Sequence, residues 1–199
     1  MYIIAGISLI PMELLTPEEG RLAYSYAMKV LNNHVAGTSF IKPEFTPVFF
    51  EKRGVFVTLT INSNLRGCIG FPHAILPLVD AIRDAAKSAA TEDPRFPPIS
   101  VSELPDISVE VTVLTEPELL MVHPHEREQA IEVGRHGLIV KGYGRSGLLL
   151  PQVPIEWGWN TREFLDHTCN KAGLPAKSWL ESAVQVFTFE GQIFNEKSD

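Results

Sequence analysis

Residues 65–70, with the sequence LRGCIG, bring together side chains and glycines that could form a chemical site. Cys68 can act as a nucleophile once its thiol loses the proton, and otherwise packs as a small apolar residue. Arg66 carries a planar guanidinium that can hold an anion. Gly67 and Gly70 allow the backbone to turn or to approach a ligand closely. The motif therefore predicts a site, although it does not specify a reaction.

Two interpretations of Cys68 follow from the residues alone. His73 comes five positions later and could serve as its general base, which would make the pair a nucleophilic centre. In cysteine enzymes, however, the paired histidine usually lies far away in sequence. In the alternative interpretation Cys68 packs in the core at a tight turn, because free cysteine is among the most buried residue types.

Prolines and tryptophans mark a second unusual segment, PQVPIEWGW at residues 151–159, between an expected strand and an expected helix. Loops of this kind often line clefts. Glu156 could act as a general base or orient Arg66, or could only favour the positive end of the following helix. Gln152 could hydrogen-bond a ligand or its own loop. Trp157 could contact a ligand, although tryptophans more often fill cores.

The histidines give no indication of a metal site. His123, His125 and His136 match none of the usual zinc spacings, and no cysteine is close to them in sequence. The segment GYGRSG at residues 142–147 lacks the Gly-Lys-Ser/Thr ending of a phosphate-binding loop. We therefore expect no metal, and the sequence leaves any cofactor undetermined.

Composition limits the class of protein. The chain has 199 residues, 45% of them hydrophobic and 21% charged, which suits a globular protein with one sizeable core or two small lobes. Its formal net charge of -7 argues against non-specific nucleic-acid binding, which depends on clustered Lys and Arg. Arg135, Lys141 and Arg145 form a small basic group around an expected hairpin, where solvated side chains are the simpler interpretation.

The two cysteines, Cys68 and Cys169, are too few for a disulfide framework and indicate free thiols in a reducing compartment, with a single bridge as the alternative. Residues 1–11 lack the basic start of a signal peptide. Their apolar run is also shorter than the roughly 20 residues that a membrane span needs. We therefore expect an N-terminal strand or tail packed on a cytoplasmic protein that does not enter a membrane.

Apolar periodicity and capping residues predict the elements that position these residues. Helices are expected at residues 16–34, 75–90, 124–133 and 159–172. Single strands are expected at 107–114 and 183–194, and hairpins at 48–51 with 55–61 and at 137–142 with 147–150. LRGCIG would follow the strand at 55–61 as a turn. Because strands and helices mix without strict alternation, the pattern indicates an α+β fold.

LRGCIG is the signature of the AMMECR domain family, and the chain resembles that family elsewhere too. The other matching segments occur in family order over about residues 22–189: DPRFPP at 93–98, ELP at 103–105, RHGL at 135–138, LPQV at 150–153 followed by Trp157 or Trp159, and KAGL at 171–174. The resemblance implies an α+β fold with mixed or antiparallel sheets packed with helices in two related lobes, and LRGCIG near the cleft between them. We expect an N-terminal extension at 1–15, one AMMECR domain at 16–194 and a tail at 195–199.

The resemblance implies no established activity. Bacterial and archaeal members are often associated with a Memo-type protein and a radical SAM protein, which implies a shared pathway. Three hypotheses follow. The first is an enzyme or enzyme component in which Arg66 binds an anion, Cys68 is a nucleophile or redox thiol, and Glu156 or His73 moves protons. The second is a binding or adaptor module that uses the segment 151–159. The third is an RNA-associated factor, which the net charge opposes.

Overall fold

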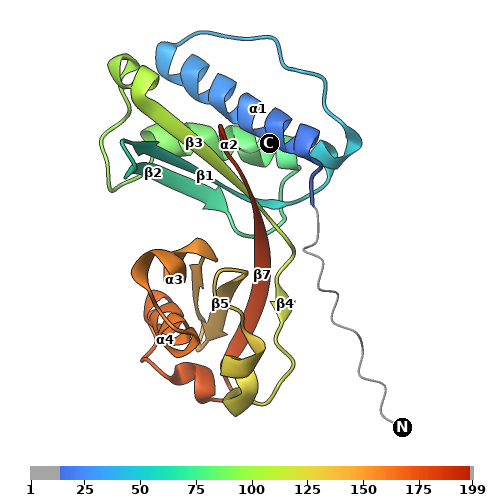
Figure 1. Ribbon diagram of the computed structural model, residues 1–199, viewed down its shortest axis with the longest axis vertical. Coiled ribbons are helices and arrows are strands. Elements are labelled where there is room, and N and C mark those ends of the chain that lie inside the picture. Colours follow the sequence, from blue (N-terminus) through green and yellow to red (C-terminus); the bar gives the residue numbers. More distant parts are fainter. Residues whose placement is uncertain (1–13, 198–199) are drawn as a thin grey trace.

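The computed structural model describes residues 14–197, whose strands form one antiparallel sheet (Figure 1). The strand order is β2-β1-β3-β7-β5-β6, and β4 pairs with β7 outside this path. The strands are β1 Gly54–Ile61, β2 Asn64–Phe71, β3 Ile107–Leu114, β4 Glu118–Leu119, β5 His136–Gly142, β6 Arg145–Leu149 and β7 Gln185–Phe194. Together with the helices packed on this sheet, they give the expected α+β fold.

The helices are α1 Pro17–Ala36, α2 Leu78–Thr91, α3 Gln152–Trp157 and α4 Thr161–Lys171, and the 3-10 segments are η1 Pro47–Phe50, η2 Val101–Asp106, η3 Pro124–Ala130 and η4 Ser178–Leu180. Helix α1 begins at the predicted cap, where Thr16 accepts from the Glu19 amide and Glu19 bonds back to the Thr16 amide. Within residues 14–197, no helix combines the length and the apolar character needed to cross a membrane.

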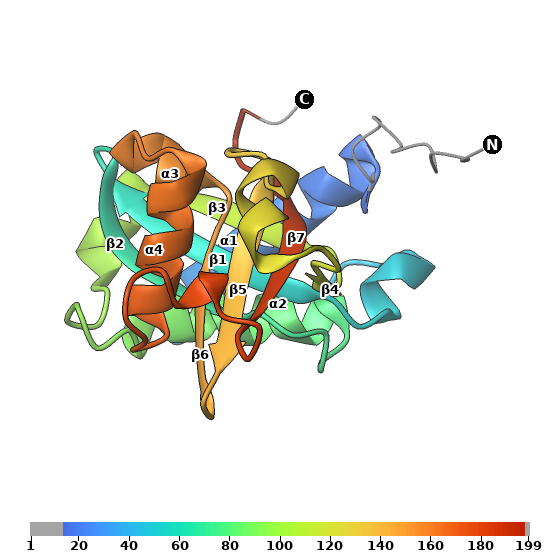
Figure 2. The same ribbon diagram turned by 90° about the horizontal axis from the view of Figure 1, so that it is seen from below.

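Two lobes share the sheet. Helices α1 and α2 pack on β1, β2 and β3 in the N-terminal lobe, while α4 packs on β5 and β6 in the C-terminal lobe. Strand β7 belongs to both lobes, as Figure 1 shows, because its residues 185–190 pair with β5 and its residues 191–194 pair with β3. In Figure 2, strand β5 runs across the direction of β1, so the sheet changes direction between the lobes.

The N-terminal lobe is built on close contact between α2 and the sheet. On the inner face of β1, Val55, Val57 and Leu59 are fully buried, as the alternating pattern predicts. The facing side of α2 is rich in alanine, which lets the helix approach the strands. Contact is closest at Gly67 of β2, where an added Cβ would lie 2.2 Å from the carbonyl oxygen of Ala89. This glycine therefore serves helix–strand packing.

The prediction for the first hairpin was wrong. Residues 48–50 belong to the 3-10 segment η1, which Pro47 opens, and not to a strand. The hairpin partner of β1 is β2, joined to it through Asn62 and Ser63, both with positive φ. Such a two-residue turn matches the twist of paired strands. LRGCIG therefore lies within strand β2 and does not form a turn after a strand.

In the C-terminal half, the observed elements agree better with those predicted from the sequence. The hairpin at 137–150 is confirmed as β5 and β6, and the helix at 159–172 is confirmed as α4 with slightly tighter ends. The segment 151–159, predicted as a loop, contains the short helix α3, which ends at Gly158 in the left-handed conformation. Residues 124–130 form a 3-10 segment in place of the predicted helix. The expectation for residues 1–11 falls outside the described residues.

Substitution of Gly67 by alanine tests the contact between β2 and α2. We expect Gly67→Ala to lower the free energy of unfolding by about 2 kcal/mol, because the new methyl group collides with helix backbone that cannot rotate away. The control is Gly37→Ala at the open end of α1, where only the left-handed backbone is strained, at a cost of about 1 kcal/mol. Urea unfolding followed by circular dichroism measures both losses, and equal losses would contradict the close contact.

Candidate functional site

A cavity of about 550 Å³ lies between the two lobes, and we call it the interlobe cleft. Its N-terminal wall comes from β1, β2 and the segment after α2, and its C-terminal wall from β6, α3 and α4. Strands β2 and β6 are the two outer strands of the sheet order, yet both line this cleft. The sheet must therefore curl until its edges face each other, and the cleft is the space that remains.

An apolar cluster joins the lobes along the cleft. Four apolar side chains line the cleft: Phe56 of β1, Leu148 of β6, Leu150 just after β6, and Val153 of α3. They pack in one cluster with Leu114, Ile139 and Phe189. Burial of these side chains holds the two walls in a fixed relation. A ligand in the cleft would meet an apolar surface on this side.

Strand alternation directs Cys68 away from α2. Because Gly67 faces that helix, Cys68 projects from the opposite face of β2. There it lies beside its strand partner Thr58, whose hydroxyl donates a hydrogen bond to the sulfur over 3.3 Å. Cys68 is partly buried and lines the interlobe cleft. The thiol of the LRGCIG motif is thus part of the cleft wall.

The turn after α2 fixes the backbone of Cys68. Asp93 accepts a hydrogen bond from the Cys68 amide over 2.9 Å, while the Arg95 guanidinium donates to the Cys68 carbonyl over 3.3 Å. Arg95 also forms an ion pair with Asp93, at 2.6 Å between Nη2 and Oδ2. The Asp93 side chain is only 2% exposed, whereas that of Arg95 is 52% exposed. This pair supplies backbone partners that an edge strand otherwise lacks.

Burial controls the charge of the site. It raises the pKa of the Cys68 thiol, and the hydrogen bond from Thr58 and the charge of Arg95 lower that pKa by less. Cys68 is therefore a neutral thiol at pH 7. The Arg95 side chain and the amide of Cys68 hold the pKa of Asp93 well below its usual range, so Asp93 is a carboxylate. The cleft thus combines an uncharged sulfhydryl with an ion pair.

A second cavity, of about 380 Å³, lies beside Thr58, and we call it the acidic cavity. Glu110 of β3 and Glu156 of α3 both line it. Glu110 is the strand partner of Thr58 on the side away from Cys68, so the three side chains share one face of the sheet. Burial raises the pKa of Glu110, a hydrogen bond with Asn195 opposes this shift by less, and the charge of Glu156 adds to the rise. Thr58 lines this cavity and Cys68 lines the interlobe cleft, so the hydrogen bond between them joins the walls of the two cavities.

Comparison with known proteins shows which family the chain belongs to. The family model described as AMMECR1 matches residues 24–194. The chain belongs to the AMMECR1 family. It is 50% identical over 188 residues to Protein MJ0810 of Methanocaldococcus jannaschii, covering 93% of this chain and 94% of that protein. It is 52% identical to Protein Mbar_A1807 of Methanosarcina barkeri over 189 residues, 92% of this chain and 93% of that protein. None of these names states an activity.

A solved structure shares the fold of this AMMECR1-family chain. The crystal structure of the uncharacterized protein PH0010 from Pyrococcus horikoshii is 45% identical in sequence, and it superposes with a TM-score of 0.87. The match covers 93% of this chain and 95% of that one. The mixed arrangement of helices and antiparallel sheet is therefore shared over nearly the whole chain.

The family motif does not place all its side chains in the cleft. Cys68 and Gly70 line it, and an added Cβ at Gly70 would lie 2.3 Å from a strand carbonyl, so the backbone is close-packed there. Gly67 faces α2 instead. Arg66 donates to Glu103 over 2.8 Å and to the Pro97 carbonyl over 2.9 Å, and it lines neither cavity. Its guanidinium links β2 to η2 through the ion pair with Glu103.

The other predicted site residues also spread apart. Glu156 lines the acidic cavity, whereas the exposed His73 lines neither cavity. Trp157 is 70% exposed and stacks on Trp159 at 6.0 Å between ring centroids. The side-chain oxygen of Gln152 is buried and has no hydrogen-bond partner in the described part of the chain. The structure thus places Cys68 and Glu156 on two different cavities and leaves His73 and Trp157 outside both.

Sequence reasoning missed Asp93, Arg95 and Glu110 as site residues. Asp93 and Arg95 stood in the family motif DPRFPP, whose Asp-Pro-Arg spacing allows the Arg95 amide to bond back to Asp93 over 3.1 Å. This turn motif could have identified Asp93 and Arg95 as site residues from the sequence. Glu110 is a single charged residue in an apolar strand, ISVEVTVL, which is unusual for a partly buried position. No group of three or more potential metal ligands occurs among residues 14–197.

The raised pKa of Cys68 predicts slow alkylation. At pH 7 we expect iodoacetamide to modify Cys68 more slowly than a free cysteine, with a rate that rises up to a midpoint above the ordinary value of 9.0. Thr58→Val removes the donated hydrogen bond and should move the midpoint higher still. Mass spectrometry follows both rates. The buried Cys169, whose pKa burial raises to about 11, is the internal control and should react only after unfolding. A Cys68 midpoint below the ordinary value of 9.0 would contradict this account.

Acid sensitivity should follow from two ion pairs. The pKa values of Asp93 and Glu103 lie below their ordinary 3.8 and 4.5, because Arg95 and Arg66 bind them, and that of Glu103 falls to about 2. Their contribution to stability is therefore full above those ordinary values and is lost as pH falls toward the folded-state values. We expect the free energy of unfolding, measured with urea, to drop between pH 5 and pH 3.

The variant Asp93→Asn isolates one of these pairs. At pH 7 it should lower the free energy of unfolding by about 2 kcal/mol, because two amides and a guanidinium lose a charged acceptor. It should also reduce the loss between pH 5 and pH 3. Asp106→Asn, on an exposed residue, is the matched control and should change neither quantity. An unchanged pH profile in Asp93→Asn would show that other groups cause the acid sensitivity.

Proposed function

We propose that this AMMECR1-family protein binds a small molecule in the interlobe cleft, in contact with the thiol of Cys68. The observation that carries this proposal is the cleft itself, whose volume of about 550 Å³ falls within the range of small-molecule sites. It lies between two lobes, where such sites are common. Its wall also combines apolar side chains with a few polar groups, which is typical of a binding site.

The wall indicates the chemistry of the ligand. Arg95 and Lys171 are the cations that line the cleft, and both are exposed to it. Lys171 forms no ion pair with any residue of the described range, so its charge is available to a ligand. Phe56, Leu148 and Val153 offer apolar contact on the same cavity. These groups favour a ligand with an apolar body and one anionic group.

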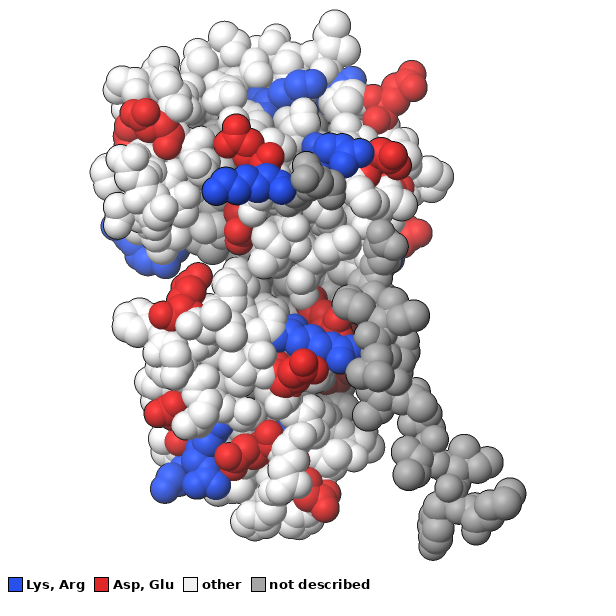
Figure 3. All heavy atoms as spheres, viewed as in Figure 1, with Lys and Arg blue, Asp and Glu red and all other residues white. Residues whose placement is uncertain are grey.

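The surface supports a small ligand over RNA. On the face in Figure 3, Lys and Arg side chains are interspersed with Asp and Glu. Nucleic-acid backbones are bound by basic stripes or patches, because affinity depends on released counterions. The chain also carries a formal net charge of -7. A cytoplasmic location forms part of the proposal, since two free thiols suit a reducing compartment.

Catalysis at Cys68 is the second candidate, and Glu110 favours it. Burial raises the pKa of the Glu110 carboxyl above its ordinary value, and general acids and bases are often carboxyl groups shifted in this direction. Glu110 shares a sheet face with Cys68, with Thr58 between them. In this candidate the sulfur attacks the carbonyl carbon of an ester and its proton passes through Thr58 to Glu110. The ester C–O bond then breaks, the alcohol leaves with a proton, and water hydrolyses the thioester that remains on Cys68. Because the thiolate is the nucleophile and the resting thiol of Cys68 is neutral, we rank binding above catalysis.

Ligand protection tests the binding proposal. We expect phenylacetate to slow the alkylation of Cys68 in a saturable way and to shift the amide signals of β2 and β6, while its neutral isostere phenylacetamide acts more weakly. Lys171→Gln should weaken phenylacetate binding roughly threefold or more, because one exposed charge is lost. Lys177→Gln, an exposed lysine outside the cleft, is the control. Alkylation that neither compound slows, with no amide shifts, would reject the proposal.

Turnover separates the two candidates. A catalytic thiol should release more than one nitrophenolate per protein from p-nitrophenyl acetate, and both Cys68→Ser and Glu110→Gln should abolish the release. A binding site should give at most one acetyl group on Cys68, detected by mass spectrometry. Release that persists in Cys68→Ser would exclude the thiol as the nucleophile.

A further inference from the structure

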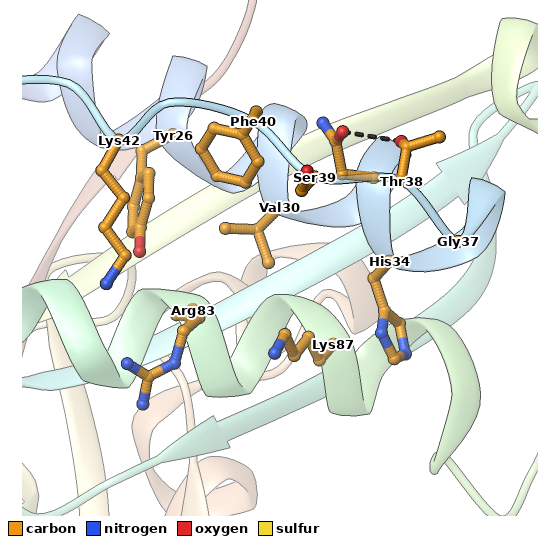
Figure 4. A pocket seen from close by; sticks show the side chains of 11 residues that line it. Tyr26, Val30, His34, Gly37, Thr38, Ser39, Phe40, Lys42, Arg83 and Lys87 are labelled. Carbon is orange, nitrogen blue, oxygen red and sulfur yellow. Dashed lines mark hydrogen bonds between the residues drawn. The ribbon is translucent and has the colours of Figure 1, made fainter.

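A third pocket, separate from the interlobe cleft and the acidic cavity, lies between α1, the segment that follows it and α2 (Figure 4). Its volume is about 370 Å³, and it shares no lining residue with the cleft. We propose that this pocket binds a small phosphate monoester whose organic group is apolar. The proposal goes beyond the function proposed for the cleft and does not depend on it.

A buried hydroxyl without a partner is the first observation. Tyr26 of α1 is 1% exposed, and its ring packs against Phe45 at 4.9 Å and Phe40 at 6.1 Å between centroids. Its hydroxyl forms no hydrogen bond with any residue in the range 14–197. Buried polar groups nearly always have a partner, so this one calls for an explanation. In Figure 4 the hydroxyl points away from α1 toward α2, beside Lys42, on the side of the residues that line the pocket.

The charges around the pocket are the second observation. Lys42, Arg83 and Lys87 line it, from two different parts of the chain, and no acidic residue among residues 14–197 does. Arg83 is occupied, because Asp80 and Asp84 bind its guanidinium. The ammonium groups of Lys42 and Lys87 have no ion pair or hydrogen bond within the described residues, and Figure 4 shows both beside the pocket. Two separate ammonium groups and one hydroxyl donor suit the oxygens of a phosphate.

The remaining wall indicates an ester and not a free phosphate. Val30 of α1 is buried, and Phe40 and the ring of Tyr26 lie next to it along the pocket in Figure 4. An inorganic phosphate would leave this apolar surface in contact with water, whereas an apolar substituent would cover it. The volume also exceeds what one phosphate group needs and falls in the range of small-molecule sites.

Phenyl phosphate is the probe, titrated into the full isotope-labelled chain. We expect saturable shifts of the amide signals of α1, residues 37–42 and α2, with an affinity clearly above that of inorganic phosphate. Tyr26→Phe should weaken binding roughly tenfold, the loss expected for one hydrogen bond to a charged group. Its thermal midpoint should be unchanged or higher, because the substitution removes a hydroxyl that has no partner and retains the ring.

The lysines are tested against a matched control. Lys42→Gln and Lys87→Gln should each weaken phenyl phosphate binding several-fold, whereas Lys29→Gln, an exposed lysine on α1 outside the pocket, should not. Several results would overturn the proposal. These are no saturable shifts at millimolar phenyl phosphate, equal affinity for inorganic phosphate, equal losses in all three lysine variants, or a Tyr26→Phe variant that is less stable yet binds normally. Shifts confined to β2 and β6 would instead report the cleft, and would also count against this pocket.

Discussion

The buried carboxylate of Asp93 is the interaction on which the cleft depends. A carboxylate that is 2% exposed is unfavourable unless charged and polar partners surround it, and here the Cys68 amide, the Arg95 amide and the Arg95 guanidinium do so. The same contacts pair the backbone of an edge strand, which would otherwise be free to bind another chain. The position of the thiol is therefore set by a residue 25 positions further along the chain.

The shared strand β7 explains why there is a cleft between the lobes. Because β7 pairs with β5 along one half and with β3 along the other, the lobes are parts of one sheet and cannot separate freely. The curl of that sheet brings β2 and β6 to one cavity. A site made from both sheet edges can contact a ligand from two sides while its walls stay anchored to a common strand.

The family motif illustrates how much sequence can predict. The residue types of LRGCIG predicted a site near Cys68, and Cys68 does line a cavity. Its glycines, however, serve close packing against α2 and against β1, so they do not form a turn. Arg66 had the right chemistry for an anion, but its partners are Glu103 and two proline carbonyls more than 30 residues away. No local pattern reports such a long-range pairing.

The sequence by itself determined the elements whose signals are local. The cap at Thr16 and the alternation of residues 107–114 act within one element, so propensity and periodicity sufficed for them. Only the tertiary structure decided which side chains meet. The raised pKa values of Cys68 and Glu110 and the unpaired hydroxyl of Tyr26 all arise from burial by distant segments. Burial belongs to the packed chain as a whole, and no single stretch of sequence contains it.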